Sequence, residues 1–164
     1  MSPKSIVQSL IDEFSCEVSV QNRSAQSLAR LDDLLAAVAE LVLRFEGRQS
    51  WWNISIVLTT DEHLRWLHAE HLDDDSVTDV MSFQYGSEVF DFVTFGEIVI
   101  SVDRAIEQAA EAGWTTTEEI TFLVTHGMLH LCGWSDSDTK SQEAMLARQH
   151  EIMSSLPFSG RLLP

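Results

Sequence analysis

Residues 125–136, THGMLHLCGWSD, constrain the structure of this chain more than any other stretch. His126 and His130 are four residues apart, so a helix places both imidazoles on one face about one turn apart. Gly133 stands where a helix would end in a left-handed turn, and Asp136 follows three residues later. This pattern brings three metal-binding side chains together and leaves a fourth tetrahedral position for water, as in catalytic zinc sites.

An alternative interpretation is a buried helix whose two histidines are satisfied by backbone carbonyls. Gly127 favours the metal site, because glycine inside a helix costs about 1 kcal/mol relative to alanine and is useful where another group approaches the backbone closely. We therefore predict a metal ion held by His126, His130 and Asp136, with Asp138 as an alternative to Asp136.

The spacing is that of the metzincin signature HxxxHxxGxxH, with aspartate in the last place. A zinc protease carries its general-base glutamate directly after the first histidine. Gly127 occupies that position in this chain. Peptide hydrolysis by the usual mechanism would lack its base, so a metallopeptidase is a minority interpretation.

Length, cysteine content and charge limit the classes of protein. A chain of 164 residues with 45% hydrophobic residues suits one domain, so we expect residues 1–164 to form a single domain with peripheral tails at 1–13 and 157–164. Two scattered cysteines, Cys16 and Cys132, indicate reduced thiols in a cytoplasmic protein. No stretch approaches the roughly 20 apolar residues of a membrane span. A net charge of −16 argues against a general nucleic-acid binder, although not against an enzyme delivered to RNA by a protein partner.

Hydrophobic periodicity predicts alternating strands and helices. In chain order we expect a strand at 16–21, a helix at 27–45, a strand at 51–58, a helix at 61–72, strands at 78–85 and 95–101, a helix from Ser101 or Asp103 to Gly113, a capped helix from Thr115–Thr117 that carries the histidine pair, and a helix at 139–154. This order predicts an α+β fold, with a mixed sheet of about four strands flanked by helices and a metzincin-like metal helix.

Two other clusters of polar side chains are interpreted as surface features. His63, His68 and His71 share the helix at 61–72, but no carboxylate or cysteine is fixed beside them by an obvious turn, so they are expected to be surface or packing histidines. Residues 73–75 (DDD) lack the glycine and distal glutamate of an EF-hand. They are expected to form a solvated loop.

Three ordered blocks of sequence resemble one known family. HGMLHLCGWSD at 126–136 is similar to the motif HG-x-LHL-x-G-[YW]-D-H of the YbeY family, bacterial rRNA maturation factors described as metal-dependent, single-strand-specific endoribonucleases. TDVMSF at 78–83 resembles the family's T-[DN]-V-[LI]-S-F, and GEIVIS at 96–101 resembles G-D-I-V-I-S. The order and separation of the blocks also match, so the likeness covers about residues 16–154.

The resemblance implies a function in rRNA maturation and ribosome quality control. Its implied reaction is hydrolysis of an RNA phosphodiester, with water activated by an ion on His126, His130 and Asp136. Zinc is the default ion, and nickel or manganese could occupy such a site. The implied partners are single-stranded RNA, rRNA in particular, and the small ribosomal subunit with its proteins. No DNA or membrane partner is expected.

Further residues of the matched blocks are candidates for supporting roles. Asp79 and Glu97 could orient a ligand histidine or relay a proton, although capping and sheet-edge roles are equally open. Phe83 and Tyr85 alternate on one strand face, where core packing is favoured over base stacking.

Two positions depart from the family pattern. Asp136 replaces the third histidine, which makes the site one charge more negative and a bound water a poorer acid. Leu72 stands where the family carries a functional arginine expected to hold phosphate charge, and Arg65 or another arginine could substitute. The missing arginine and the acidic surface favour an alternative function, a non-catalytic, metal-binding ribosome-assembly factor that recognises basic ribosomal proteins.

Overall fold

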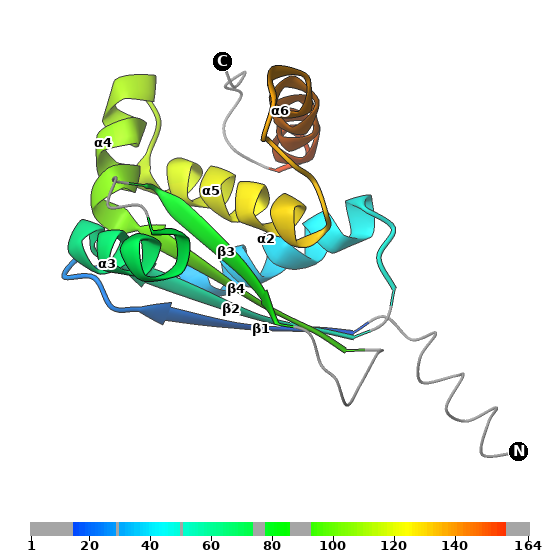
Figure 1. Cartoon of the computed structure of the whole chain (residues 1–164), viewed down its shortest axis with the longest axis horizontal. Helices are drawn as coiled ribbons and strands as arrows, with labels where there is room; N and C mark the ends of the chain where they lie inside the picture. The colour runs from blue at the N-terminus through cyan, green and yellow to red at the C-terminus, as the bar shows by residue number, and fades with distance from the viewer. Residues whose placement is uncertain (1–14, 29, 50, 74–77, 86–92, 157–164) are drawn as a thin grey trace, which may run out of the picture.

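A computed structural model of the chain describes residues 15–28, 30–49, 51–73, 78–85 and 93–156 (Figure 1). The tails expected at 1–13 and 157–164, and Asp74 and Asp75 of the acidic loop, lie outside these residues. None of the described helices combines the length and the apolar character needed to cross a membrane.

The described residues form four strands and five helices, in the predicted order. Their bounds are β1 Ser15–Asn22, α2 Leu31–Phe45, β2 Trp51–Thr59, α3 Asp61–Leu72, β3 Val80–Tyr85, β4 Val93–Ser101, α4 Val102–Ala112, α5 Thr116–Leu131 and α6 Thr139–Ser154. The predicted α+β class with a four-stranded mixed sheet is confirmed.

The sheet has the strand order β1-β2-β4-β3. β1, β2 and β4 run parallel, and α2 provides the crossover that the parallel pair β1 and β2 requires. β3 runs antiparallel to β4 and forms one edge of the sheet. The block that contains Thr78–Phe83 therefore leads into the edge strand and forms most of it.

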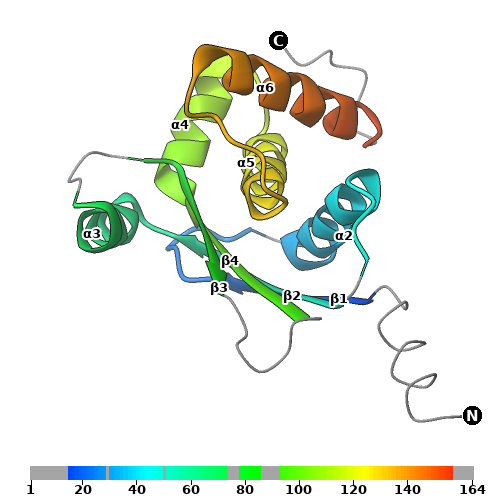
Figure 2. The same cartoon turned by 45° about the vertical axis from the view of Figure 1, so that its right-hand side comes forward.

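The two faces of the sheet carry cores of different size. Alternate strand residues such as Ile56 and Ile98 face α2 and α5 in the larger core, whereas Val57 and Val99 face Leu64 of α3 in a smaller cluster. α6 packs on α5, on the side away from the sheet (Figure 2). The helix that carries the histidine pair thus lies between the sheet and α6, and 11 of its 16 residues are buried.

Helix ends follow local sequence signals at most positions. The expected capping box of α5 is present: Thr115 accepts a hydrogen bond from the Glu118 backbone, and the Glu118 carboxylate accepts one from the Thr115 backbone. The helix expected from residue 27 starts only at Leu31. Its start is delayed because the Asn22 side chain donates to the carbonyl of Gln26 (2.8 Å) and holds the intervening residues in a turn.

Gly127 lets α5 approach the sheet closely. A Cβ atom at this position would lie 2.9 Å from Cγ2 of Ile98 and 2.9 Å from Oγ of Ser82. The Ser82 hydroxyl donates a hydrogen bond to the Gly127 carbonyl (3.2 Å). The close approach expected beside His126 is confirmed, and the group that approaches is the sheet. Position 127 therefore has no room for the glutamate of a zinc protease.

Replacing Gly127 with alanine should destabilise the protein by up to about 2 kcal/mol. Overpacking against Ile98 and Ser82 costs about 1–3 kcal/mol, and the roughly 1 kcal/mol that alanine gains over glycine in a helix offsets part of this cost. Urea unfolding followed by circular dichroism measures the change. Ala110→Gly on the exposed side of α4 measures the difference in helix propensity between alanine and glycine without a change in packing. A Gly127→Ala variant more stable than the wild type would contradict the steric interpretation.

Candidate metal centre

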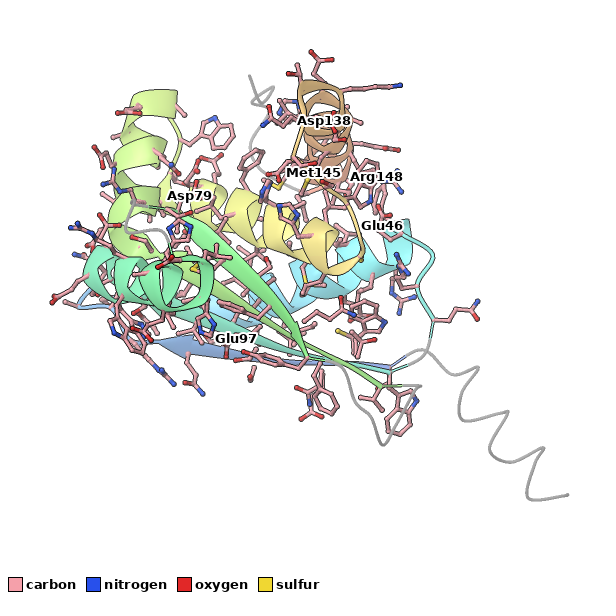
Figure 3. The ribbon with its side chains drawn as sticks, viewed as in Figure 1. Glu46, Asp79, Glu97, Asp138, Met145 and Arg148 are labelled. Carbon is pink, nitrogen blue, oxygen red and sulfur yellow. The ribbon has the colours of Figure 1, made fainter. Side chains whose placement is uncertain are left out.

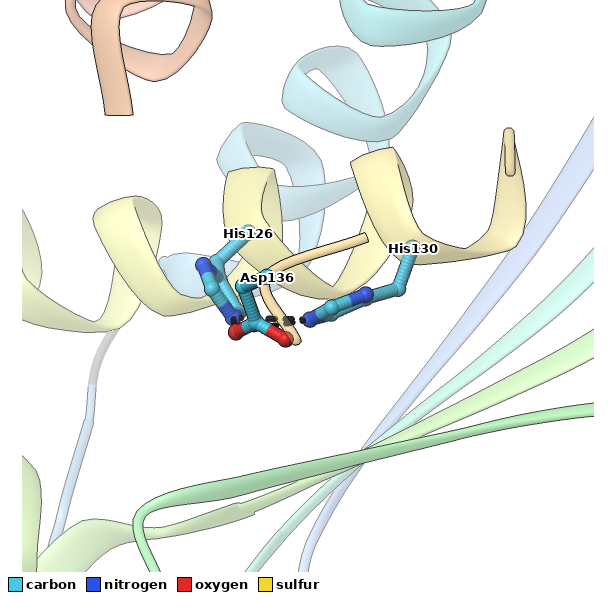
Figure 4. A group of neighbouring side chains, drawn as sticks. All are labelled: His126, His130 and Asp136. Atoms are coloured by element: carbon cyan, nitrogen blue, oxygen red, sulfur yellow. Dashed lines mark hydrogen bonds and ion pairs between the residues drawn. The ribbon is translucent and has the colours of Figure 1, made fainter. Parts of the chain in front are cut away.

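The C-terminal turn of α5 directs three predicted ligands toward one point. His126 and His130 project from the same face of the helix, one turn apart (Figure 4). Gly133 has a φ of 96°, and its N–H donates to the carbonyl of His130 (2.9 Å), which closes the helix in the expected left-handed turn. The chain then reverses and brings Asp136 between the two imidazoles.

The donor atoms of these three side chains are closely spaced. Nε2 of His126 lies 3.0 Å from Nε2 of His130, and Oδ2 of Asp136 lies 3.4 Å from each of these nitrogens. Within the part of the chain that the structure describes, this is the group of histidine and carboxylate side chains that could hold a metal ion. All three side chains are partly exposed, so solvent or a substrate can reach them.

Hydrogen bonds on the far side of each ring orient the imidazoles. Nδ1 of His130 lies 3.0 Å from the backbone oxygen of Trp134, which can only accept, so Nδ1 carries the proton. Nδ1 of His126 likewise lies 3.0 Å from Oε1 of Gln149. In neutral imidazoles this leaves both Nε2 lone pairs facing each other and the Asp136 carboxylate.

This set of donors fits a divalent cation. Three lone-pair donors converge within 3.0–3.4 Å of one another, an arrangement that is repulsive unless a positive charge lies between them. Tetrahedral ligands at the usual zinc distances of about 2.0–2.1 Å are roughly 3.3–3.4 Å apart, close to the observed spacing.

The structure places the rival ligand Asp138 elsewhere. Its carboxylate caps the N-terminus of α6 and accepts hydrogen bonds from the backbone N–H and the hydroxyl of Ser141, both at 2.9 Å. These bonds lower the pKa of Asp138. Asp136, and not Asp138, lies with the two histidines.

Asp79 and Glu97 are not brought together. Asp79 lies beside the candidate metal centre and accepts a hydrogen bond from Nε2 of Gln108 (3.1 Å). Glu97 pairs with Phe83 across β4 and β3 on the sheet face that α3 covers, away from α5. The imidazole-orienting role considered for these two residues is occupied in the structure by Gln149 and by the carbonyl of Trp134.

A cleft of about 600 Å³ runs along the edge strand β3, between α3 and the candidate metal centre. His68 and His71, expected to be surface or packing residues, both line it, and the His71 ring lies 5.0 Å from the ring of Phe83. Leu72 also lines the cleft. None of the described residues in its lining is lysine or arginine, so Arg65 does not replace the missing guanidinium there.

The two aromatic residues of β3 have different environments. Phe83 is partly buried in the small cluster beneath α3 and also lines the cleft. Tyr85 is exposed at the end of the strand. Core packing therefore accounts for Phe83 but not for Tyr85.

Glu119 is a functional candidate that the sequence did not single out. It is buried on α5, two helical turns before His126. Burial, with a further contribution from the charge of Asp79, raises the pKa of Glu119 to about 7. The seven-residue spacing, which places Glu119 on the same helix face as His126, was the signal available in the sequence. Only the packing of α4, α5 and β3 gives the Glu119 carboxyl surroundings of low dielectric.

A second network fixes the loop that follows α5. Glu46, beyond the end of α2, accepts a hydrogen bond from the Trp134 indole (3.0 Å) and pairs with Nε of Arg148 on α6 (2.8 Å). Figure 3 shows Glu46 and Arg148 side by side between these helices. Because the carbonyl of Trp134 accepts a hydrogen bond from His130, a network that fixes Trp134 also fixes the orientation of this predicted ligand.

Replacing Glu46 with glutamine should weaken metal binding roughly tenfold, at the lower end of the range for groups that support ligands from outside. The change removes the charge that holds Arg148 and weakens the bond to Trp134. Competition with a zinc chelator measures the affinity. Glu40→Gln is a matched control, because Glu40 forms an exposed pair with Arg44 on α2. Equal affinities of the two variants would contradict the supporting role.

The sequence model of the family described as Endoribonuclease YbeY matches residues 17–157 of this chain. The chain belongs to this family. The resemblance inferred from the three sequence blocks is thereby confirmed, and those blocks form the end of α5 with its turn, the edge strand β3 and its neighbour β4.

Relatives with the same family description are similar over most of their length. The Endoribonuclease YbeY of Symbiobacterium thermophilum is 36% identical over 137 residues, which cover 78% of this chain and 88% of the relative. That of Bacillus velezensis is 33% identical, with 79% and 86% covered. A Thermotoga maritima protein whose structure was solved in solution matches with a TM-score of 0.55 at 21% identity, covering 87% of this chain and 99% of the other, and shares its fold.

Proposed function

We propose that this chain is a metal-dependent endoribonuclease that cleaves single-stranded RNA in rRNA maturation and ribosome quality control. The convergence of His126, His130 and Asp136 beside an open cleft carries the proposal. Membership of the Endoribonuclease YbeY family supports RNA as the substrate. We also propose the small ribosomal subunit as the partner and the cytoplasm as the location, as the resemblance of the three sequence blocks implies.

The proposed site residues divide into ligands and supports. His126, His130 and Asp136 would hold one divalent ion, with zinc favoured because two imidazoles and a carboxylate suit it. A bound ion supplies Lewis acidity for phosphodiester hydrolysis. Gln149 and the Trp134 carbonyl keep each Nε2 free of a proton.

The cleft itself supplies the remaining contacts to the RNA backbone. His68 and His71 line its α3 side, where their ring N–H groups can donate hydrogen bonds to phosphate oxygens. They are the described cleft residues best suited to the phosphate-binding role, because Leu72 has no polar group and no described lysine or arginine lines the cleft. Phe83 and the His71 ring offer surfaces on which a base can stack.

A non-catalytic ribosome-assembly factor is the second candidate function. The net charge of −16 and the cleft without a described lysine or arginine favour binding to basic proteins over binding to RNA. The metal would then stabilise the turn after α5 rather than act in hydrolysis.

One experiment separates these functions. Purified protein with its metal content measured is incubated with single-stranded RNA, duplex RNA and casein, with and without a chelator. Cleavage of single-stranded RNA that disappears with the chelator and in His126→Ala supports the endoribonuclease. Bound metal with neither RNA nor casein cleaved supports the assembly factor, and cleavage of casein alone would establish a peptidase and overturn both.

A further inference from the structure

A second cavity, of about 290 Å³, adjoins the metal centre between α5 and α6. Its walls are mainly apolar, with Phe122 and Leu123 contributed by α5 and Met145 and Leu146 by α6. Figure 3 shows Met145 on the side of α6 that faces α5. This volume lies at the low end of the range for small-molecule sites, which suits one planar ring system rather than a longer ligand.

One polar side chain of this cavity lacks a partner. Gln149 lines the cavity and is only 2% exposed. Its Oε1 accepts the hydrogen bond from His126, but its Nε2 has no hydrogen-bond partner among the described residues. A buried N–H group without an acceptor costs about 1–3 kcal/mol. The amide nitrogen is therefore an unsatisfied donor buried at the wall of this cavity.

The cavity and the cleft share one boundary. Asp79, Val80, His126 and Asp136 line both, so the two spaces meet at the metal centre. A strand whose phosphate lies at the metal ligands can extend along the cleft in one direction and place its neighbouring base in the cavity in the other.

We propose that this cavity, the base pocket, binds the nucleobase next to the scissile phosphate, with the Gln149 amide donating to a base carbonyl. The proposal rests on the proposed endoribonuclease function. Uracil, cytosine and guanine present a carbonyl oxygen to this donor, whereas the acceptors of adenine are ring nitrogens only. A neutral base is also compatible with the acidic protein, because its binding needs no cationic side chain. The base pocket thus predicts a preference for uridine over adenosine at this position.

The first test measures binding without catalysis. Metal-free protein labelled with ¹⁵N is titrated with uridine and, separately, with adenosine, while the side-chain amide signals of Gln149 and of the exposed Gln21 are followed. Uridine should shift the Gln149 signal and leave that of Gln21 in place, and adenosine should produce a clearly smaller shift. Equal shifts with both nucleosides, or no shift of Gln149, would overturn the proposal.

The second test fills the pocket from its rim. Leu146 is 44% exposed and lines the pocket, so Leu146→Trp should occupy it without disturbing the core. Ile106→Trp on α4 is the matched control, because Ile106 is 38% exposed and does not line the pocket. Leu146→Trp should weaken uridine binding at least about tenfold and lower the ratio of poly(U) to poly(A) cleavage, at unchanged metal content. Identical behaviour of the two variants would contradict the base pocket.

The two tests distinguish a failure of the base pocket from a failure of the proposed function. If the protein cleaves no RNA but binds uridine, and Leu146→Trp abolishes this binding, the base pocket is supported and the endoribonuclease function is contradicted. If the protein cleaves RNA regardless of base identity and its Gln149 signal does not respond to uridine, the endoribonuclease function is supported and the base pocket is contradicted.

Discussion

Replacement of Asp136 by alanine will lower zinc affinity by more than about 100-fold and reduce RNA cleavage in parallel. The loss should exceed the 10–100-fold typical of groups that only support a ligand, because the change removes a donor atom that lies 3.4 Å from both imidazole nitrogens. Elemental analysis and chelator competition measure the metal, and a single-stranded RNA assay measures the activity.

Two further variants make this result specific. Asp138→Ala removes a nearby carboxylate that only caps α6, so it should leave zinc affinity unchanged and lower stability only through the loss of this cap. Asp136→His keeps a donor at the same position and should retain zinc. Full metal content in Asp136→Ala, or its loss in Asp138→Ala, would remove Asp136 from the ligand set.

Replacement of Glu119 by glutamine will change how stability depends on pH. The pKa of Glu119 is raised from 4.5 to about 7 in the folded protein, so the folded state binds more protons than the unfolded state between these values. The wild type therefore loses stability as pH rises from about 4.5 to about 7, and the full penalty of about 3 kcal/mol is present above pH 7. Glu119→Gln should remove this loss.

Urea unfolding at pH 5 and pH 8 measures the effect. The stability of Glu119→Gln relative to the wild type should be about 2–3 kcal/mol more favourable at pH 8 than at pH 5. Asp79→Asn provides a check, because it removes only the smaller cause of the raised pKa and should give an intermediate pH dependence. A pH dependence shared by the wild type and Glu119→Gln would show that Glu119 does not titrate in this range.

Local signals in the sequence were sufficient to predict the helices and strands and the convergence of the two histidines. The spacing of His126 and His130, the glycine turn at Gly133 and the capping box at Thr115 each depend on residues only a few positions apart. Helix geometry and capping act over that range, so these features were predictable without the tertiary structure. The turn that carries Asp136 is also local, but the spacing left Asp138 as an alternative that only the structure excluded.

Only the tertiary packing determines which residues surround the three side chains. Gln149 reaches His126 across 23 positions, and Glu46 reaches Trp134 across 88. No periodicity relates segments at such separations, since their meeting depends on how α2 and α6 pack against α5. The same packing places His68 and His71 in the cleft and raises the pKa of Glu119 by burial. The sequence alone therefore determined that the two imidazoles converge and that a turn follows them. The structure decided between Asp136 and Asp138 as their companion, and packing set the orientation of the rings, their dielectric surroundings and the space left for a substrate.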